Sequence, residues 1–124
     1  MIEGTVNDIL EPVVTLVVSG VAERTSRVDA LIDTGYGGDL MLPTDVVRDL
    51  GLVRVGATRL VLANGMEESF HTYMATVDWS GNKRGVAVHA TSAAALIGMR
   101  LLEGHNLQID VRQGGRVLIE TLTA

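Results

Sequence analysis

The sequence places one aspartate directly after a strand-like run of apolar residues. Residues 30–32 read Ala-Leu-Ile, and Asp33, Thr34 and Gly35 follow, with more glycine beyond. An aspartate at the end of an apolar strand is costly unless it accepts hydrogen bonds or shares a proton with a like partner. The Thr34 hydroxyl can tie down the loop, and Gly35 lets the backbone bend so that its N–H points at the carboxylate. The pattern indicates a carboxylate used in acid–base chemistry; the ordinary alternative is a capping or turn aspartate.

A second motif follows roughly sixty residues later, in the stretch Ala-Ala-Ala-Leu-Ile-Gly-Met-Arg at 93–100. Leu96 and Ile97 are typical of the end of a strand, and Gly98 follows them directly. A short helix is predicted next, and Gly104 supplies its stop. The chain therefore has two apolar segments that each run into a glycine-containing loop.

The two motifs together resemble retropepsin-type aspartic proteases, the small single-domain forms that include retroviral proteases and their bacterial relatives. The resemblance covers most of the chain, from the strand at residue 13 to the last strand. It implies that Asp33-Thr34-Gly35 is the catalytic triplet. It also implies that Leu96-Ile97-Gly98 is the strand that supports the catalytic loop and crosses it.

A hairpin is predicted between two alternating strands, turning at Asn64-Gly65, because both central positions of such a turn need positive φ. The resemblance implies that its tip, Ala63-Asn64-Gly65-Met66, is a flap over bound substrate. In the catalytic loop, Tyr36 and Gly37 are expected to contact the substrate as well. Retroviral members usually carry a small residue at the position of Tyr36, so the tyrosine departs from the viral pattern.

Aspartic proteolysis needs two carboxylates that share one proton, one to activate water and one to polarise the scissile carbonyl. This chain has a single Asp-Thr-Gly, so we expect a homodimer that places Asp33 opposite its symmetry mate. The 47% hydrophobic content fits a subunit with a buried interface, and residues 116–122 are a plausible strand for an intersubunit sheet. Activity is expected on the acid side of neutral, with no metal or other cofactor.

The predicted function is an aspartic endopeptidase that hydrolyses peptide bonds by water activated between the two Asp33 carboxylates. The alternative is a non-catalytic, dimeric peptide-binding or assembly module of the same fold. Tyr36 favours this alternative if its side chain blocks the position of the water, whereas the intact Asp-Thr-Gly favours the enzyme. A third possibility is an enzyme that processes only its own precursor or one dedicated partner.

These residues must be positioned by many short strands, glycine turns and two short helices. The pattern indicates one domain over residues 1–124, mostly β, with a closed, barrel-like fold. The resemblance implies that this barrel is acid-protease-like, with one lobe per chain. The first helix is predicted at 43–50, with Pro43 in its first turn and Thr44 or Asp45 as its cap. Strands and hairpins are predicted in residues 12–20, 27–32, 57–79, 84–90 and 106–122.

Composition argues against several other classes of protein. A formal net charge of −5 and scattered basic residues argue against nucleic-acid binding. The absence of cysteine excludes disulfides and thiolate metal sites. No run approaches the roughly 20 apolar residues of a membrane span. Residues 1–20 contain no export signal, so a cytoplasmic location is expected.

Other polar residues are given ordinary roles. The three histidines lack the spacing of metal ligands and are expected on strands or at the surface. They are His71, His89 and His105. Asp29 and Asp39 flank Asp33 and are expected to be solvated or to lie at the dimer contact.

Overall fold

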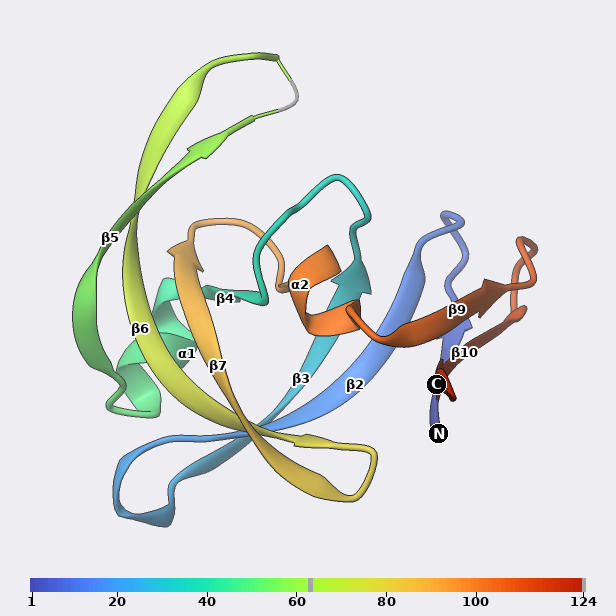
Figure 1. Cartoon of the computed structure of the whole chain (residues 1–124), viewed down its shortest axis with the longest axis horizontal. Helices are drawn as coiled ribbons and strands as arrows, with labels where there is room; N and C mark the ends of the chain where they lie inside the picture. The colour runs from blue at the N-terminus through green and yellow to red at the C-terminus, as the bar shows by residue number, and fades with distance from the viewer. Residues whose placement is uncertain (63, 124) are drawn as a thin grey trace.

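The computed structural model describes residues 1–62 and 64–123, which contain ten strands and two short α-helices (Figure 1). The strands are β1 (Ile2–Val6), β2 (Pro12–Ser19), β3 (Thr25–Ile32), β4 (Leu40–Pro43), β5 (Val53–Val61), β6 (Glu67–Trp79), β7 (Asn82–Thr91), β8 (Leu96–Ile97), β9 (His105–Ile109) and β10 (Arg116–Thr121). The helices are α1 (Thr44–Asp49) and α2 (Met99–Leu102), and a 3-10 turn spans Val21–Glu23. No helix in the described residues has the length and apolar character needed to cross a membrane.

Six of the described strands close into a barrel in the order β6-β7-β4-β8-β3-β2. The seam is the pairing of β2 with β6, where Val18 lies opposite Val77 and Ser19 opposite Thr76. The pairs β3–β8 and β4–β7 are parallel, and the other pairs around the ring are antiparallel. The mostly β, closed, barrel-like fold with two short helices is therefore confirmed.

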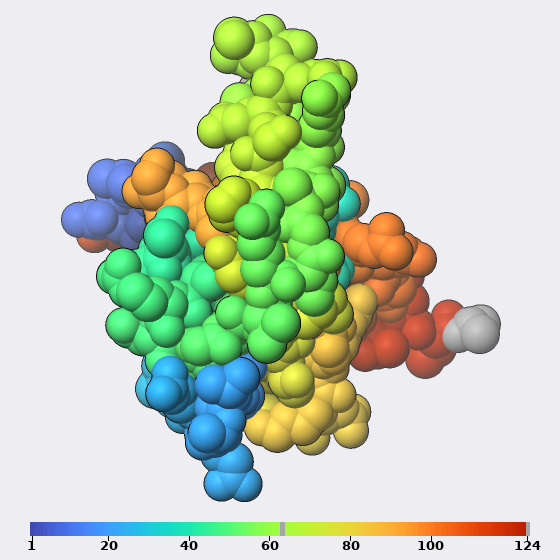
Figure 2. All heavy atoms as spheres, turned by 90° about the vertical axis from the view of Figure 1, so that its left-hand side faces the viewer, coloured from blue at the N-terminus to red at the C-terminus, as the bar shows by residue number. Residues whose placement is uncertain are grey.

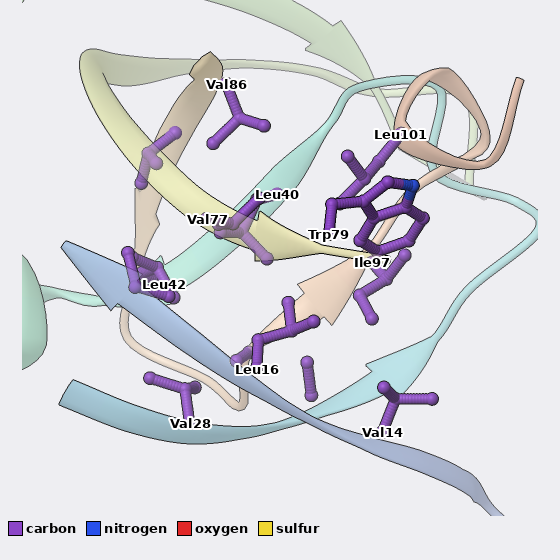
Figure 3. Close-up of a cluster of buried hydrophobic side chains, with 14 of the residues drawn as sticks. Val14, Leu16, Val28, Leu40, Leu42, Val77, Trp79, Val86, Ile97 and Leu101 are labelled. Atoms are coloured by element: carbon purple, nitrogen blue, oxygen red, sulfur yellow. The ribbon is translucent and has the colours of Figure 1, made fainter. Parts of the chain in front are cut away.

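The barrel closes because its strands turn apolar faces inward. In β2, Val14, Leu16 and Val18 are buried while Thr15 between them is exposed, which is the period of a strand with one buried face. Figure 3 shows side chains from β2, β3, β4, β6, β7 and β8 meeting in one cluster. Burial of each such side chain contributes about 1.5–3 kcal/mol. The cluster includes Ile97, so packing against the core holds β8 in place directly before Gly98.

The segment before α1 differs from the prediction. Leu40–Pro43 forms β4, inserted between β7 and β8, rather than a loop that leads into a helix. Pro43 is the N-cap of α1, and no side chain caps the helix. The Thr44 hydroxyl, which was expected to cap, donates to the carbonyl of Thr91 instead (3.2 Å). A buried strand of four residues is too short to be distinguished by period from a helix entry.

The terminal strands also correct an expectation. Strand β10, which contains most of residues 116–122, pairs with β1 on one edge and with β9 on the other, all in the same chain. Within the described residues, β1 occupies one edge over 116–119 and β9 occupies the other over 117–121, so most of β10 has no free edge for a strand from a second subunit. Figure 1 shows this small sheet beside the barrel, reached through β2. The edge strands of the whole described sheet are β5 and β9.

The hairpin of β5 and β6 extends well beyond the barrel. In Figures 1 and 2 its distal half, coloured green to yellow-green, rises from the body of the molecule. The Leu62 N–H donates to the carbonyl of Met66 (2.8 Å), and Gly65 has a φ of +81°. Val61 and Met66 are exposed near the tip. The predicted hairpin around Asn64-Gly65 is confirmed by the pairing of β5 with β6.

Candidate active site

Asp33 lies directly after β3, in the loop that leads to β4. Its backbone N–H donates to the carbonyl of Ile97 in β8 (2.9 Å). Its carboxylate oxygen Oδ1 accepts a hydrogen bond from the N–H of Gly35 (2.9 Å), the contact expected from the sequence. The residue is half-buried, so its side chain is held at one oxygen and remains accessible. This geometry fits a carboxylate that must exchange protons with a bound molecule.

The loop is bound closely to the segment around Gly98. The Gly98 N–H donates to the carbonyl of Asp39 (3.0 Å), and the Met99 N–H donates to the carbonyl of Tyr36 (2.8 Å). The Arg100 N–H donates to the carbonyl of Gly38 (3.1 Å). Three successive donors at the start of α2 thus hold residues 36–39 of the loop. The segment that the resemblance placed across the catalytic loop does lie there.

Tyr36 occupies the space inside this loop. Its side chain is only 6% exposed. A Cβ added to Gly98 would lie 2.6 Å from Cδ2 of the Tyr36 ring, and a Cβ on Gly38 would collide with the tyrosine hydroxyl. Both glycines are therefore required by packing against the ring. The loop folds around Tyr36 as its own small core.

The Tyr36 hydroxyl lies 2.5 Å from Nδ1 of His89 in β7. Burial raises the pKa of Tyr36 far above its ordinary value, and the nearby Asp39 carboxylate raises it further. Burial lowers the pKa of His89 below 6.5, an effect that Asp39 partly opposes. The two pKa shifts favour the neutral forms of both groups, which share this hydrogen bond. His89 is 5% exposed and is the buried polar residue of the described core.

The two aspartates that flank Asp33 have contacts within the chain. Asp39 accepts a hydrogen bond on Oδ2 from the N–H of Ala87 (3.0 Å), so it fixes the start of β4 against β7. Asp29 accepts a hydrogen bond on Oδ1 from the Thr15 hydroxyl (2.6 Å), across β2 and β3. Asp39 is therefore an anchor of the loop, and a place at the dimer contact stays a prediction.

A cleft of about 630 Å³ opens above the loop. Its floor contains Asp33, Gly35, Tyr36 and Gly37, and Leu96 adjoins them. Its walls and roof come from residues 60–62, 68–71 and 90–92, with Met41, Thr44 and Tyr73. Residues of the β5–β6 hairpin thus line the same open cleft as the Asp33 carboxylate, and the lining mixes apolar with polar side chains. A cleft of this kind is the usual setting of a small-molecule or peptide site.

The predicted site residues do not all meet at this cleft. Asn64, Gly65 and Met66 lie at the exposed hairpin tip and are not among its lining residues, while Ala63 lies outside the described residues. The side chain of Thr34 is exposed and makes no hydrogen bond within residues 1–62 and 64–123, so the expected clamp is not formed by this chain alone. The stem of the hairpin, rather than its tip, lines the space.

Sequence reasoning missed two parts of the site. The first is the inner face of the hairpin stem, which brings Leu60, Leu62 and Phe70 to the cleft. The alternation of the two strands about Asn64-Gly65 would have identified that face. The second is His89, a single polar residue in the apolar run Val-Ala-Val-His-Ala. The same kind of signal, a polar residue in an apolar strand, had identified Asp33.

The three histidines lie in three different environments. His71 lines the cleft, His89 contacts Tyr36, and His105 accepts a hydrogen bond on Nε2 from the Trp79 indole (3.1 Å). Within the described part of the chain, no three His, Asp or Glu side chains gather in a way that would hold a metal ion.

Comparison with known proteins identifies the fold. No family model and no curated protein matches the sequence. Among solved structures, the chain is similar to the EIAV protease in complex with the inhibitor HBY-793, with a TM-score of 0.61 and 14% identity over 75% of this chain and 86% of that one. It is also similar to a retropepsin-like aspartic protease from Rickettsia conorii, with a TM-score of 0.59 and 16% identity over 98% of this chain and 91% of that one. The chain therefore has a retropepsin-like fold.

Proposed function

We propose that this retropepsin-like chain is an aspartic endopeptidase that acts as a homodimer. The observation that carries the proposal is the setting of Asp33: a half-buried carboxylate, held on one oxygen by Gly35, on the floor of a roofed cleft. The sequence contains a single Asp-Thr-Gly, so one chain supplies one of the two carboxylates that the reaction needs.

In the proposed reaction the two Asp33 carboxylates share one proton. The ionised carboxylate takes a proton from water, and the water oxygen attacks the scissile carbonyl carbon. The protonated carboxylic acid gives its proton to the carbonyl oxygen, forming a neutral tetrahedral diol. When the diol collapses, the carboxyl that took the water proton gives it to the amine nitrogen, the other carboxylate takes a proton from a diol hydroxyl, and the C–N bond breaks to leave an amine and a carboxylic acid. The dyad then returns to its shared-proton state, so all atoms and protons balance.

The surface around Asp33 supports pairing at a two-fold axis. Thr34, Gly35 and Gly37 are exposed on the loop. Met99, which donates its N–H to the loop, has a side chain that is 49% exposed. A two-fold interface uses the same patch on both subunits, so an axis beside this loop brings Asp33 to its own copy. Thr34 and Gly35 are proposed as the other members of the catalytic triplet.

The cleft supports a peptide as the substrate class. Leu60, Leu62 and Phe70 form an apolar roof above Asp33, which suits the side chains of an extended peptide segment. Tyr36 and Gly37 are proposed to line the substrate site from the floor. The tip residues Asn64, Gly65 and Met66, together with Ala63, are proposed to reach substrate only when the hairpin closes, because the tip does not line the cleft in this conformation.

The non-catalytic alternative depended on Tyr36 blocking the water. The tyrosine side chain is turned into the core, and its hydroxyl contacts His89. This burial argues against a ring that projects into the cleft to block the water. No other observation favours a binding module over an enzyme, and we retain the endopeptidase as the proposed function.

The decisive test is Asp33→Asn, which keeps the size of the side chain but removes the acid. Wild type and variant are compared on casein and on a peptide library from pH 4 to pH 8, with light scattering to measure the oligomeric state. We expect wild-type cleavage with its maximum below pH 7, and a loss of at least about a thousandfold in the variant, which remains dimeric. Cleavage by purified Asp33→Asn at a rate near wild type would rule out the mechanism.

The dimer itself is tested by dilution. If each active centre needs two chains, specific activity falls steeply as the concentration passes through the dissociation constant measured by light scattering. Specific activity that stays constant across that range would exclude a shared centre. A pepstatin-type transition-state analogue that restores the dimer at low concentration would provide independent support.

A further inference from the structure

We propose that His89 is a positioning residue for the proposed reaction: through the Tyr36 hydroxyl it fixes the loop that carries Asp33 against the strands that carry the cleft roof. The proposal rests on the proposed function but concerns residues that the mechanism above does not use. It assigns a role to the buried polar pair of the described core, whose members lie 53 residues apart in the sequence.

Tyr36 connects this pair to the carboxylate. Its N–H donates to the carbonyl of Asp33 (3.2 Å), and its own carbonyl accepts from the N–H of Met99 (2.8 Å). Its ring fills the interior of the loop against Gly38 and Gly98. The backbone of the loop is therefore fixed by where the ring sits. At its far end, the ring is fixed by the hydrogen bond to His89.

His89 connects the pair to the cleft roof. It lies on β7 opposite Thr72 of β6, and on its other side opposite Met41 of β4. The His89 and Phe70 rings lie close together, with 6.3 Å between their centroids and an angle of 48° between their planes. Phe70 and Met41 both line the cleft. One imidazole thus contacts the floor through Tyr36 and approaches the roof through Phe70.

Donation by the Tyr36 hydroxyl requires a neutral imidazole, because a protonated ring would reverse the bond, with Nδ1–H donating to the tyrosine oxygen. For Nδ1 to accept from the tyrosine hydroxyl, the ring must carry its proton on Nε2. A protonated His89 would present an N–H at Nδ1 and leave the buried hydroxyl proton without this acceptor. Among the described residues, the charged or titratable groups that face His89 are the Tyr36 hydroxyl and the Asp39 carboxylate. The packed residues Thr72 and Phe70 from β6 and Met41 from β4 do not titrate.

A bond that depends on the neutral ring gives the reaction a lower pH limit. A shared-proton dyad is expected to work below neutrality. Because burial lowers the pKa of His89, the neutral ring persists into that same mildly acidic range. Further acidification protonates His89, reverses the bond and leaves the buried Tyr36 hydroxyl proton without this acceptor, which loosens the loop. The fall in activity at low pH then reflects protonation of His89 as well as protonation of the two Asp33 carboxylates.

The molecule contains a matched comparison pair. Trp79 and His105 also form an aromatic–histidine hydrogen bond, with an interplanar angle of 81°, against 71° for Tyr36 and His89. Neither Trp79 nor His105 lines the cleft. His105→Asn is therefore the control for the general cost of replacing a histidine that is bonded to an aromatic ring.

The test uses Tyr36→Phe, His89→Leu, His89→Asn and the control His105→Asn in the full chain. An Asn side chain can place its amide oxygen near the position of Nδ1, so it keeps an acceptor but does not titrate. First, NMR of the labelled histidine rings is compared in wild type and Tyr36→Phe. We expect the Nε2–H tautomer in wild type, and a higher pKa of His89 when the hydroxyl is removed. Identical tautomer and pKa in both proteins would overturn the hydrogen bond.

Amide exchange then tests positioning without relying on activity. Exchange at residues 33–36 is expected to accelerate in Tyr36→Phe and His89→Leu and to stay near wild type in His89→Asn and His105→Asn. On a peptide substrate, kcat is expected to fall about tenfold in Tyr36→Phe and in His89→Leu, with KM little changed. In His89→Asn, the pH at which kcat falls on the acid side is expected to shift. Equal losses in His89→Leu and His89→Asn would overturn positioning through the bond. Absence of wild-type cleavage would reject the proposed function, and the exchange data alone would then decide the role of the pair.

Discussion

Gly98 packs against the loop that carries Asp33 and Gly65 lies at the tip of the β5–β6 hairpin, and each position needs glycine for a different reason. At Gly98 the backbone is extended, with φ of −98°, but an added Cβ would meet the Tyr36 ring and the carbonyl of Gly38. At Gly65 the φ is +81°, which disfavours other residues, yet no described heavy atom lies within 4 Å of an added Cβ. One glycine is required by crowding and the other by backbone conformation alone.

The two glycines mark two parts of the site. The loop at residues 33–39, which forms the floor of the cleft, is tightly packed, whereas the β5–β6 hairpin, which forms its roof, has few packing contacts at its tip. The floor loop is held by successive backbone hydrogen bonds and by a buried ring, so its atoms have little room to move. The distal hairpin projects beyond the barrel, with exposed side chains and only its own cross-strand bonds. Local opening is cheapest where few apolar contacts are buried. The roof is therefore the part of the cleft that can open most easily while the Asp33 carboxylate keeps its place.

The largest effect is expected when the floor is crowded. Gly98→Ala forces the Tyr36 ring or the loop carbonyl to shift, and overpacking of this kind costs about 3 kcal/mol of unfolding free energy. Urea denaturation measures the loss. Activity should fall with stability, because the same shift displaces the loop that carries Asp33. If Gly98→Ala is as stable as wild type, the floor is far more adaptable than its packing indicates.

A smaller and more local effect is expected at the roof. Gly65→Ala places a side chain at positive φ and should cost about 1–2 kcal/mol, confined to the hairpin. Hydrogen exchange should accelerate in residues 58–62 and 66–70 and stay unchanged in β2 and β3. Gly65→Asn is the matched control, since asparagine tolerates this conformation better. Equal exchange rates in the two variants would show that conformation at the tip does not control hairpin opening.

The pH dependence of the unfolding free energy should follow the titration of His89, which is hydrogen-bonded to Tyr36. Because burial lowers the folded pKa of His89 below 6.5, the unfolded chain binds more protons in this range. Stability is therefore complete above about pH 6.5 and is lost as the pH falls from there through the folded pKa. Urea unfolding between pH 8 and pH 5 measures the slope, which should flatten in His89→Asn. A slope that is the same in both proteins would assign the titration to other groups.

The smallest effect is expected from the ion pair on the hairpin. Arg59 and Glu67 lie 3.8 Å apart with both side chains largely exposed. Removing such a pair costs at most about 0.5 kcal/mol, so Arg59→Ala should leave both urea unfolding and hairpin exchange within error of wild type. A larger loss would mean that the roof is held more tightly than its exposure indicates.

Local sequence patterns were sufficient where the structure depends on neighbouring residues. The apolar run into Asp33, the bend at Gly35 and the hairpin at Asn64-Gly65 each follow from a few adjacent residues. The family resemblance, rather than a local pattern, implied that residues 96–98 support the Asp33 loop, and β8 pairs with β3 directly before that loop. The barrel followed from the number of short strands and turns.

Long-range features were not accessible in the same way. The hydrogen bond between Tyr36 and His89 joins residues far apart in the chain, and no local pattern pairs them. Strand β4 was missed because an apolar run before a proline also fits a helix entry. The position of β10 inside its small sheet depends on strand order, which alternation does not specify.

The arrangement of β10 has a consequence for how two chains would come together. Because its neighbours β1 and β9 belong to the same polypeptide, the small sheet is complete before any encounter. Assembly of the proposed homodimer would then proceed by docking of two folded subunits. Its association rate constant would be about 10⁵–10⁷ M⁻¹s⁻¹, the usual range when two specific surfaces must meet in the correct orientation. Separated subunits would remain folded and reusable, so abundance alone could turn the activity on or off.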